Sequence, residues 1–386
     1  MNIITKMLKL RGVFPALSTR FASSLIRQRP AFHEVFPQKK MVNRLLFELD
    51  SRLTFNKLYP VYESIYESLD KSTDASIPNG FTGKDLMIMK KVIEKIRHKT
   101  KTINKNLLAL ENEILDLAAE KGDNDAISLL CFDVLKDPSH NSDEDVTHAK
   151  RLIKELYKKE HPLTVKLTAD IALLNSDDIT AEKYYLKFLD LQNDTFLAGE
   201  VYGQLGQIHF RKPDLVKAEQ CFLKAIKLCP IDYSVRSYFL LGQIYINNDV
   251  FKARSLIESS ATQGFRESFK TLGLLEMNYF KNYPKAQEWF KLGMELYDIQ
   301  CYIGYFDCAM FSDNILLAKK CFESFTKLSE SNQDIKKLFE TFCAHRVDDI
   351  KRVNDYILPS STLNPLPNVA ASNAKTDVSK SNTWNL

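Results

Sequence analysis

The sequence predicts an all-α protein, in which a row of stacked helical hairpins follows an N-terminal helical extension. Alanines recur at intervals of 32 to 37 residues between Ala149 and Ala318, and periods of this length are typical of helical repeats. No strand-type alternation with hairpin turns occurs in the sequence. Of the 386 residues, 45% are apolar and 26% are charged, which is ordinary for globular proteins and excludes wholesale disorder.

Each recurring alanine begins a pattern that fits one helix face. A large apolar residue follows four positions later, as Tyr185 follows Ala181 and Phe222 follows Ala218. A third residue of the same face follows seven positions after the alanine, and the spacing i, i+4, i+7 marks one side of a helix. A small residue followed by a large one suits a second helix that packs closely on a first. The six alanines are Ala149, Ala181, Ala218, Ala253, Ala286 and Ala318.

The first helix of each hairpin has its own pattern. A Leu-Gly pair recurs at 205–206, 241–242 and 272–273, each time three residues after an aromatic side chain. In residues 199–232, eight signature positions of a 34-residue tetratricopeptide repeat carry fitting side chains. His209 stands where tyrosine is usual, and we expect it to be a partly buried packing residue. These features predict a tetratricopeptide- or Sel1-like helical-hairpin solenoid.

The chain begins with a predicted targeting sequence. Residues 1–30 contain no acid and can form a cationic amphipathic helix, which is typical of a mitochondrial presequence. The net charge of +4 arises there, because residues 1–33 hold six Lys and Arg and the remaining chain is at −2. A helical region over 31–136 follows, with an apolar block at 40–70, a linker at 70–83 and a basic helix after it. Thr82 and Asp85 have the spacing of a helix capping box.

The remaining elements follow in order. A helix pair over 104–136 leads into an acidic loop over 137–145. Six repeats, two of them degenerate, are expected over 146–329, with capping helices over 330–358. The segment 359–386 is rich in Ser, Asn and Pro and is expected to be disordered.

The sequence contains no pattern that favours catalysis. The histidines show no metal-binding spacing and no phosphate-binding lysine loop occurs. Acidic residues such as Glu111, Glu113 and Asp143 are expected on solvated helix faces or in the acidic loop. The seven cysteines form no CxxC pair, and most are expected to be buried thiols. No stretch of 18 residues is both predominantly apolar and free of charges, so no membrane-spanning helix is predicted. We therefore predict a protein that is not an enzyme and that binds no cofactor or metal.

In a stack of helical hairpins, the first helices line a concave groove that serves for binding. Here the groove would carry amides and both charges, which suits an extended peptide; a purely structural face is the alternative. It lacks the Lys/Asn/Lys/Arg clamp that holds the C-terminal carboxylates of chaperones, because Glu200 stands where its second lysine would be. The predicted groove residues are Lys166, Asp170, Glu200, Gln207, Arg211, Arg236, Gln243, Asn247, Lys270, Met277 and Asn278.

The stretch from Lys84 to Lys105 holds eight basic residues and two acids. The simplest interpretation is a helix that packs on the body and exposes a solvated basic face. A second is a surface that docks on anionic lipid, where each basic residue adds about 1 kcal/mol; RNA binding is a third. The candidates for membrane docking are Lys90, Lys91, Lys95 and Lys99.

Several segments between 32 and 345 resemble the fungal mitochondrial tetratricopeptide proteins that are required for assembly of cytochrome c oxidase subunit II. Some of these segments lie outside the generic repeat positions, so they are more specific than the fold. They are residues 36–40, 45–62 (LLFELDSRLTFNKLYPVY), 124–130 (NDAISLL), 161–167 (HPLTVKL), 197–208 (LAGEVYGQLGQI) and 269–297.

The resemblance implies a matrix protein at the inner membrane, without enzymatic activity, that helps the export translocase to move the C-terminal tail of subunit II across the membrane. The first hypothesis is therefore an assembly chaperone that holds this tail in its groove. The alternative is an RNA-binding mitochondrial translation factor built on helical repeats, which would need a basic groove. The mixed groove and the net charge of −2 after residue 33 make RNA the weaker hypothesis.

Overall fold

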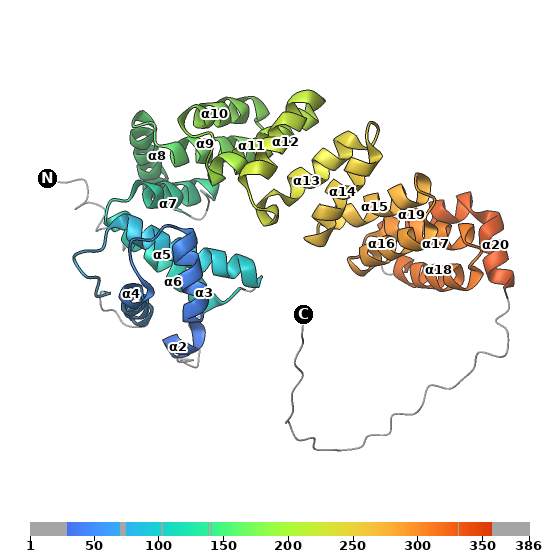
Figure 1. Ribbon diagram of the computed structural model, residues 1–386, viewed down its shortest axis with the longest axis horizontal. Coiled ribbons are helices and arrows are strands. Elements are labelled where there is room, and N and C mark those ends of the chain that lie inside the picture. The colour runs from blue at the N-terminus through green and yellow to red at the C-terminus, as the bar shows by residue number, and fades with distance from the viewer. Residues whose placement is uncertain are drawn as a thin grey trace, which may run out of the picture. The chain divides into compact units, whose positions relative to one another are not determined.

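The computed structural model describes residues 29–69, 75–101, 103–137, 139, 141–330 and 332–356. Within these ranges all regular structure is helical, in 19 helices from Phe32 to Asp355 (Figure 1). None of these helices is long and apolar enough to cross a membrane. The helices belong to two compact units, residues 1–244 and 245–386. The predicted presequence, apart from its last two residues, and the predicted disordered tail lie outside the described residues.

The first unit begins with five helices around one apolar core, which extends from Phe32 to Ala126. The helices are α2 (Phe32–Val35), α3 (Lys39–Glu48), α4 (Phe55–Ser68), α5 (Gly83–Thr100) and α6 (Lys105–Glu120). Tyr62 is fully buried in this core. Its hydroxyl donates to the carbonyl of Met89 at 2.8 Å, so the buried polar group is satisfied.

The predicted capping box at the start of α5 is confirmed. The Thr82 hydroxyl accepts from the Asp85 backbone amide at 3.4 Å, and the Asp85 carboxylate accepts from the Thr82 amide at 2.8 Å. Arg52 also donates to the Asp85 carboxylate. These bonds hold the pKa of Asp85 down to about 2, with the Arg52 hydrogen bond as the largest cause and burial opposing it.

The prediction of an acidic loop over 137–145 is wrong in its last third. The helix α8 (Asp143–Lys158) includes Asp143, Glu144 and Asp145 in its first turn. Ser142 caps this helix by accepting from the Asp145 amide at 3.2 Å. Acidic side chains are stabilised at this end because the helix dipole is positive there. Before it, α7 (Asn124–Lys136) follows a turn in which Gly122 has a φ of +78°, a conformation that favours glycine.

The repeat helices of the first unit confirm the small-then-large pattern. They are α9 (Pro162–Leu174), α10 (Asp178–Leu191), α11 (Phe196–Arg211), α12 (Leu215–Leu228) and α13 (Ile231–Tyr245), whose last residue belongs to the second unit. Ala218 and Phe222 are fully buried. A Cβ atom at Gly206 would lie 2.5 Å from the Phe222 ring, so the missing side chain lets α11 and α12 approach closely. His209 is buried, as predicted.

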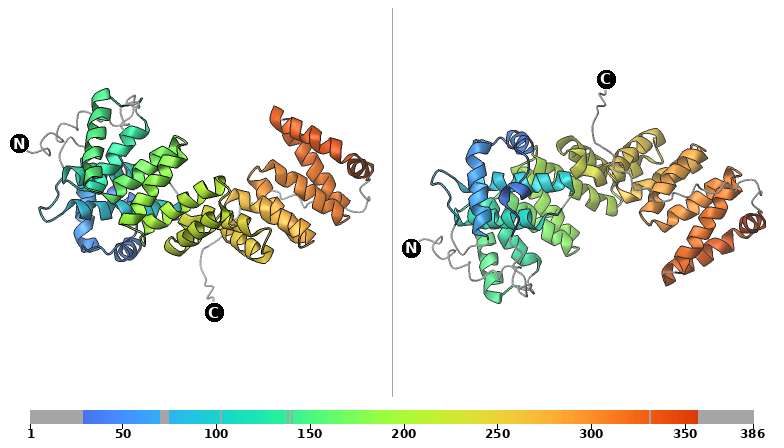
Figure 2. Two further views of the ribbon diagram at one scale, coloured as in Figure 1. Left: turned by 90° about the horizontal axis from the view of Figure 1, so that it is seen from above. Right: turned by 90° about the horizontal axis from the view of Figure 1, so that it is seen from below.

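The second unit repeats this packing. It contains α14 (Val250–Thr262), α15 (Arg266–Asn278), α16 (Tyr283–Glu295), α17 (Ile299–Phe311), α18 (Ile315–Ser329), α19 (Gln333–His345) and α20 (Val347–Asp355). Figure 2 shows α15 to α18 side by side from two further directions. A Cβ atom at Gly273 or at Gly304 would come within 2.5 and 2.3 Å of the Phe290 ring. One buried ring therefore packs against the backbones of both α15 and α17.

The N-termini of five repeat helices, α10, α12, α14, α16 and α18, are capped in the same way. The side chain of an Asp or Asn residue at the N-cap accepts a hydrogen bond, 3.0 to 3.3 Å long, from the backbone amide three residues later. Such caps satisfy amides that have no partner inside the helix. The caps are Asp177, Asp214, Asp249, Asn282 and Asn314.

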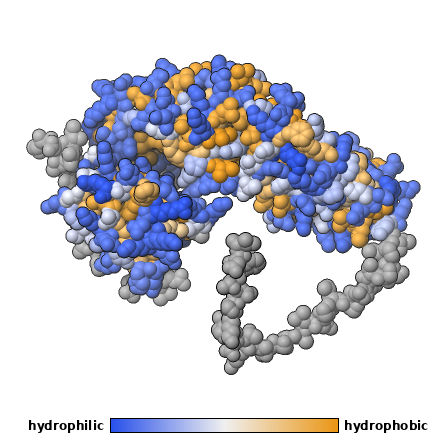
Figure 3. Space-filling view, in the orientation of Figure 1, coloured by the Kyte–Doolittle hydropathy of each residue, from blue (hydrophilic) through white to orange (hydrophobic). Residues whose placement is uncertain are grey.

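The surface of the repeats is not uniformly polar. Ile179 of α10 and Val216 and Leu223 of α12 are exposed, and Figure 3 shows apolar residues among polar ones on the face in view. Single exposed apolar side chains are normal on soluble proteins. Of the seven cysteines, five are buried and two are half-buried, in line with the predicted core thiols.

Candidate functional site

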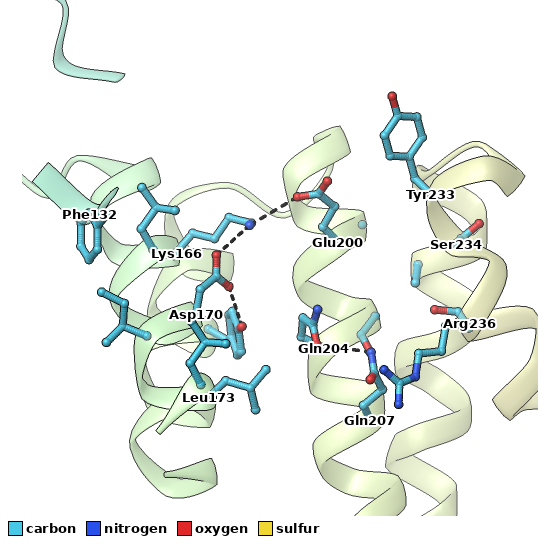
Figure 4. A pocket seen from close by; sticks show the side chains of 18 of the residues that line it. Phe132, Lys166, Asp170, Leu173, Glu200, Gln204, Gln207, Tyr233, Ser234 and Arg236 are labelled. Atoms are coloured by element: carbon cyan, nitrogen blue, oxygen red, sulfur yellow. Dashed lines mark hydrogen bonds and ion pairs between the residues drawn. The ribbon is translucent and has the colours of Figure 1, made fainter. Parts of the chain in front are cut away.

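A pocket of about 540 Å³ opens among the repeat helices of the first unit (Figure 4). The helices α7, α9, α10, α11, α12 and α13 contribute to its lining. Five predicted groove residues lie in it, namely Lys166, Asp170, Glu200, Gln207 and Arg236. The structure therefore brings together side chains that the sequence placed on successive first helices, because one face of each such helix points to the same side of the stack.

Lys166 joins two of these helices. Its ammonium nitrogen lies 3.0 Å from Asp170 Oδ2 on the same helix and 3.4 Å from Glu200 Oε2 on α11. The Tyr185 hydroxyl donates to the other oxygen of Asp170 at 2.6 Å. Burial alone would lower the pKa of Lys166, but the two carboxylates raise it above its usual value. Burial raises the pKa of Glu200, and Lys166 opposes this shift.

Small residues and amides form the middle of the pocket. A Cβ atom at Gly203 would lie 3.3 Å from Ser237 Oγ, so a larger side chain there would narrow the space between α11 and α13. The Gln207 amide donates to the Gly203 carbonyl and to Gln204 Oε1, both at 3.3 Å. Amide side chains both donate and accept, which matches the alternating groups of an extended peptide backbone.

An aromatic contact that the sequence analysis missed forms one rim of the pocket. Tyr233, a lining residue on α13, stacks on His98 of α5 with ring centroids 4.5 Å apart and planes at 9°. Phe196 also contacts Tyr233, with ring centroids 4.9 Å apart and planes at 90°. The N-terminal helical region thus contacts the repeat pocket directly. No periodic signal joins residues 98 and 233, so the sequence offers no means to find this contact.

The remaining predicted groove residues do not line this pocket. Arg211 instead forms a two-point ion pair with Asp178 of α10, at 2.7 and 3.2 Å. Gln243 is half-buried on α13. The others belong to the second unit, where Lys270 donates to Gln300 at 2.8 Å, Met277 is buried, and Asn247 and Asn278 are exposed.

The lysines of α5 that the sequence offered for membrane docking are largely engaged within the protein. Lys90 lies 2.7 Å from Glu94, and Lys95 and Lys99 lie 3.6 and 3.7 Å from Glu48 of α3. Lys91 is exposed. These ion pairs favour the interpretation in which α5 packs on the body.

The prediction that Glu111 lies on a solvated helix face is wrong. Its side chain is buried against α5, with Arg97 at 3.3 Å and Lys90 at 3.5 Å. A buried carboxylate needs such partners because the loss of its hydration is otherwise uncompensated. This burial could not be predicted from local spacing, because both partners come from another helix.

One polar cluster has the composition of a catalytic triad without its accessibility. Ser128 Oγ lies 3.5 Å from His161 Nδ1, and His161 Nε2 lies 3.3 Å from Asp125. The hydrogen bond from His161 lowers the pKa of Asp125, although burial opposes the shift. Ser128 is fully buried and donates to the carbonyl of Asn124 at 2.8 Å. The cluster therefore ties α7 to α9, and its hydroxyl faces no substrate.

Comparisons with known proteins agree with this architecture. Residues 28–123 match the family described as the MSS2 N-terminal domain, and residues 199–232 match the tetratricopeptide repeat. The second match coincides with the predicted repeat, which confirms the fold class. Solved structures with similar helices include yeast Tom70 (15% identity, TM-score 0.40, 92% of this chain and 73% of that chain) and Pseudomonas aeruginosa PilF (14%, 0.43, 56% and 96%).

A curated relative covers most of the sequence. The protein is 41% identical over 346 residues to the Saccharomyces cerevisiae protein "Protein MSS2, mitochondrial", which aligns with 86% of this chain and over 97% of its own length. Helical repeats without an evident catalytic centre are typical of scaffolds for protein–protein interaction. On this identity and coverage, the chain belongs to the MSS2 family of mitochondrial helical-repeat proteins.

Proposed function

We propose that the protein is a mitochondrial assembly factor for cytochrome c oxidase that binds the C-terminal tail of subunit II in the pocket of its first unit. The pocket is the observation on which the proposal rests: a space of about 540 Å³ lined by amides, both charges and apolar side chains. Such a lining suits an extended, hydrophilic peptide. The choice of subunit II as the partner follows from the resemblance of segments such as residues 45–62 and 269–297 to the assembly proteins of that subunit.

The tail would be held on the matrix side of the inner membrane and passed to the export translocase. Membership in a mitochondrial family supports import into the organelle. Peripheral binding to an anionic membrane belongs to the same proposal, but α5 is a poor candidate for the contact, because Lys90, Lys95 and Lys99 already face carboxylates. Of the three cations that line the pocket, Lys136 and Lys166 already face carboxylates. A single remaining cation offers little to an RNA backbone, which binds through several unpaired cations.

A protease-protection assay tests this proposal. In mitoplasts from cells that lack the protein, the subunit II tail should stay on the matrix side and resist added protease; wild-type protein should restore its cleavage. Normal export in the absence of the protein would refute the assembly role.

A second comparison tests the pocket itself. Gln207→Trp places a bulky ring in the pocket and should block export. Gln220→Trp is the matched control, because Gln220 is exposed on α12 and does not line the pocket. If Gln207→Trp supports export as well as the control does, the tail binds elsewhere.

A further inference from the structure

One charged side chain among those that line the pocket has no ion-pair partner in the described part of the protein. Lys166 is shared between Asp170 and Glu200, at 3.0 and 3.4 Å. Lys136, at the α7 side, lies 3.2 Å from Asp133. Arg236 is exposed and forms no ion pair with any residue that the structure describes. A ligand that fills the pocket therefore meets, at Arg236, one cation that no carboxylate of the described residues contacts.

The surroundings of Arg236 indicate what kind of group it can bind. Figure 4 shows its guanidinium on the side of the pocket where Gln207 lies, away from the Lys166–Glu200 bridge. A guanidinium presents a planar fork of N–H groups that matches the two oxygens of a carboxylate. The amides of Gln204 and Gln207 lie on the neighbouring helix and can bind a peptide backbone beside it.

We propose that the pocket selects an acidic peptide segment, whose carboxylate binds Arg236 while its backbone passes the two glutamines. This inference rests on the proposed function and adds the chemical class of the tail segment. The pocket binds a single carboxylate of the peptide, because Lys166 is already paired with Asp170 and Glu200 and is not available as a second cation. Gly203 lines the pocket without a side chain, so no group projects from this position of α11 towards α13 and an extended backbone can approach.

The position of the aromatic rim supports an extended ligand. Tyr233 contacts both His98 and Phe196, and these contacts restrict its ring before any ligand binds. A rigid wall reduces the entropy that binding must offset. A segment that lies along α11 would place its backbone against the amides and one acidic side chain, or its chain end, at Arg236.

The test uses the full-length protein and fluorescein-labelled peptides of about 12 residues, long enough to span the pocket, that cover the subunit II tail. Fluorescence anisotropy selects the peptide that binds most tightly. This peptide is then compared with one form in which every Asp and Glu becomes Asn or Gln and another in which only the C-terminus is amidated. Loss of binding in one form identifies the source of the carboxylate.

We expect the acidic peptide to bind about tenfold more tightly than the form that lacks its carboxylate, as is typical of a charge-assisted hydrogen-bonded pair. Arg236→Gln should remove this difference, and Arg236→Lys should keep part of it. Arg211→Gln is the matched control: Arg211 is an exposed arginine of the neighbouring first helix, but it pairs with Asp178 and lies outside the pocket. It should bind both peptides as the wild type does.

The outcomes separate the two proposals. If no tail peptide binds the wild-type protein, the proposed function is wrong and carboxylate selection falls with it. If tail peptides bind but neither modified form binds more weakly than the unmodified peptide, or Arg236→Gln has no effect, carboxylate selection is wrong while peptide binding stands. Equal weakening by Arg236→Gln and Arg211→Gln would also overturn it, because it would indicate general electrostatic attraction.

Discussion

Replacing Gly273 by alanine tests the close packing of the repeat helices. The new Cβ atom would lie 2.5, 2.6 and 2.7 Å from three carbons of the Phe290 ring, whereas carbon atoms in contact prefer about 3.5–4.0 Å. Overpacking of this kind costs about 1–3 kcal/mol. The higher helix propensity of alanine offsets about 1 kcal/mol. Because all three contacts are about 1 Å too short, the overpacking cost should lie in the upper half of that range, about 2–3 kcal/mol. We therefore expect Gly273→Ala to lower the free energy of unfolding by about 1–2 kcal/mol.

Trp289 provides a local probe, since it neighbours Phe290 on α16 and is one of only two tryptophans in the sequence. Urea unfolding followed by fluorescence, in a Trp384→Phe background, reports on the second unit. Gly80→Ala is the control, because no atom beyond its two chain neighbours lies within 4 Å of a Cβ atom there. Its unfolding is followed by circular dichroism, since Gly80 belongs to the first unit. That variant should stay within about 0.5 kcal/mol of the parent protein.

A double-mutant cycle identifies the ring as the cause. In a Phe290→Leu background the clash is relieved, so Gly273→Ala should become neutral or stabilising, with a coupling energy of at least about 1 kcal/mol. A Gly273→Ala variant that is as stable as the parent protein while Phe290 is present would refute the reasoning. It would mean that α15 and α16 are further apart than the structure shows.

Three further predictions concern buried polar groups. The folded pKa of Asp85 is about 2, below the unfolded value of about 3.9, so the stability that its carboxylate contributes is fully present above pH 4 and is lost as the pH falls towards 2. Asp85→Asn should therefore lower the free energy of unfolding by about 2 kcal/mol at pH 7. Urea titrations at pH 7 and pH 2 should show that the variant and the parent protein differ at the higher pH and converge at the lower one. Burial raises the pKa of Cys308 to about 12, so iodoacetamide at pH 8 should alkylate the half-buried Cys343 first, as peptide mass spectrometry can determine; earlier modification of Cys308 would contradict its burial. Glu276 is almost fully buried, 2.7 Å from Arg254, and Glu276→Gln should therefore cost about 3 kcal/mol in thermal or urea unfolding; an unchanged midpoint would show that this pair is solvated.

The repeats could be predicted because the residues that pack their helices recur at short, regular intervals along the sequence. Ala181 and Tyr185 lie one helical turn apart on the same face, so a short window of sequence contains the signal. Contacts between neighbouring repeats could also be anticipated in principle, since Lys166 and Glu200 lie on the facing sides of successive first helices. The five residues of the pocket were identified in this way.

Contacts between different kinds of elements could not be predicted. The stack of His98 on Tyr233 joins the N-terminal region to a repeat, and no common period relates them. The charges of α5 were interpreted within one helix, whereas Glu48 and Glu111 reach it from α3 and α6. At residues 143–145 the acidic composition suggested a loop, but Ser142 followed by acids is also the pattern of a helix start, and this pattern prevailed.

The ring of Phe290, which packs on Gly273 and on Gly304, bears on how the second unit opens. In a linear array, stability is the sum of terms for each hairpin and for each interface between neighbours. The Phe290 side chain contributes to two interfaces, so the free energies of these interfaces cannot be assigned separately. Unfolding of either α15 or α17 exposes the same ring. The segment from α15 to α17 should thus exchange its amide hydrogens as one cooperative block, while hairpins without such a shared ring can fray singly.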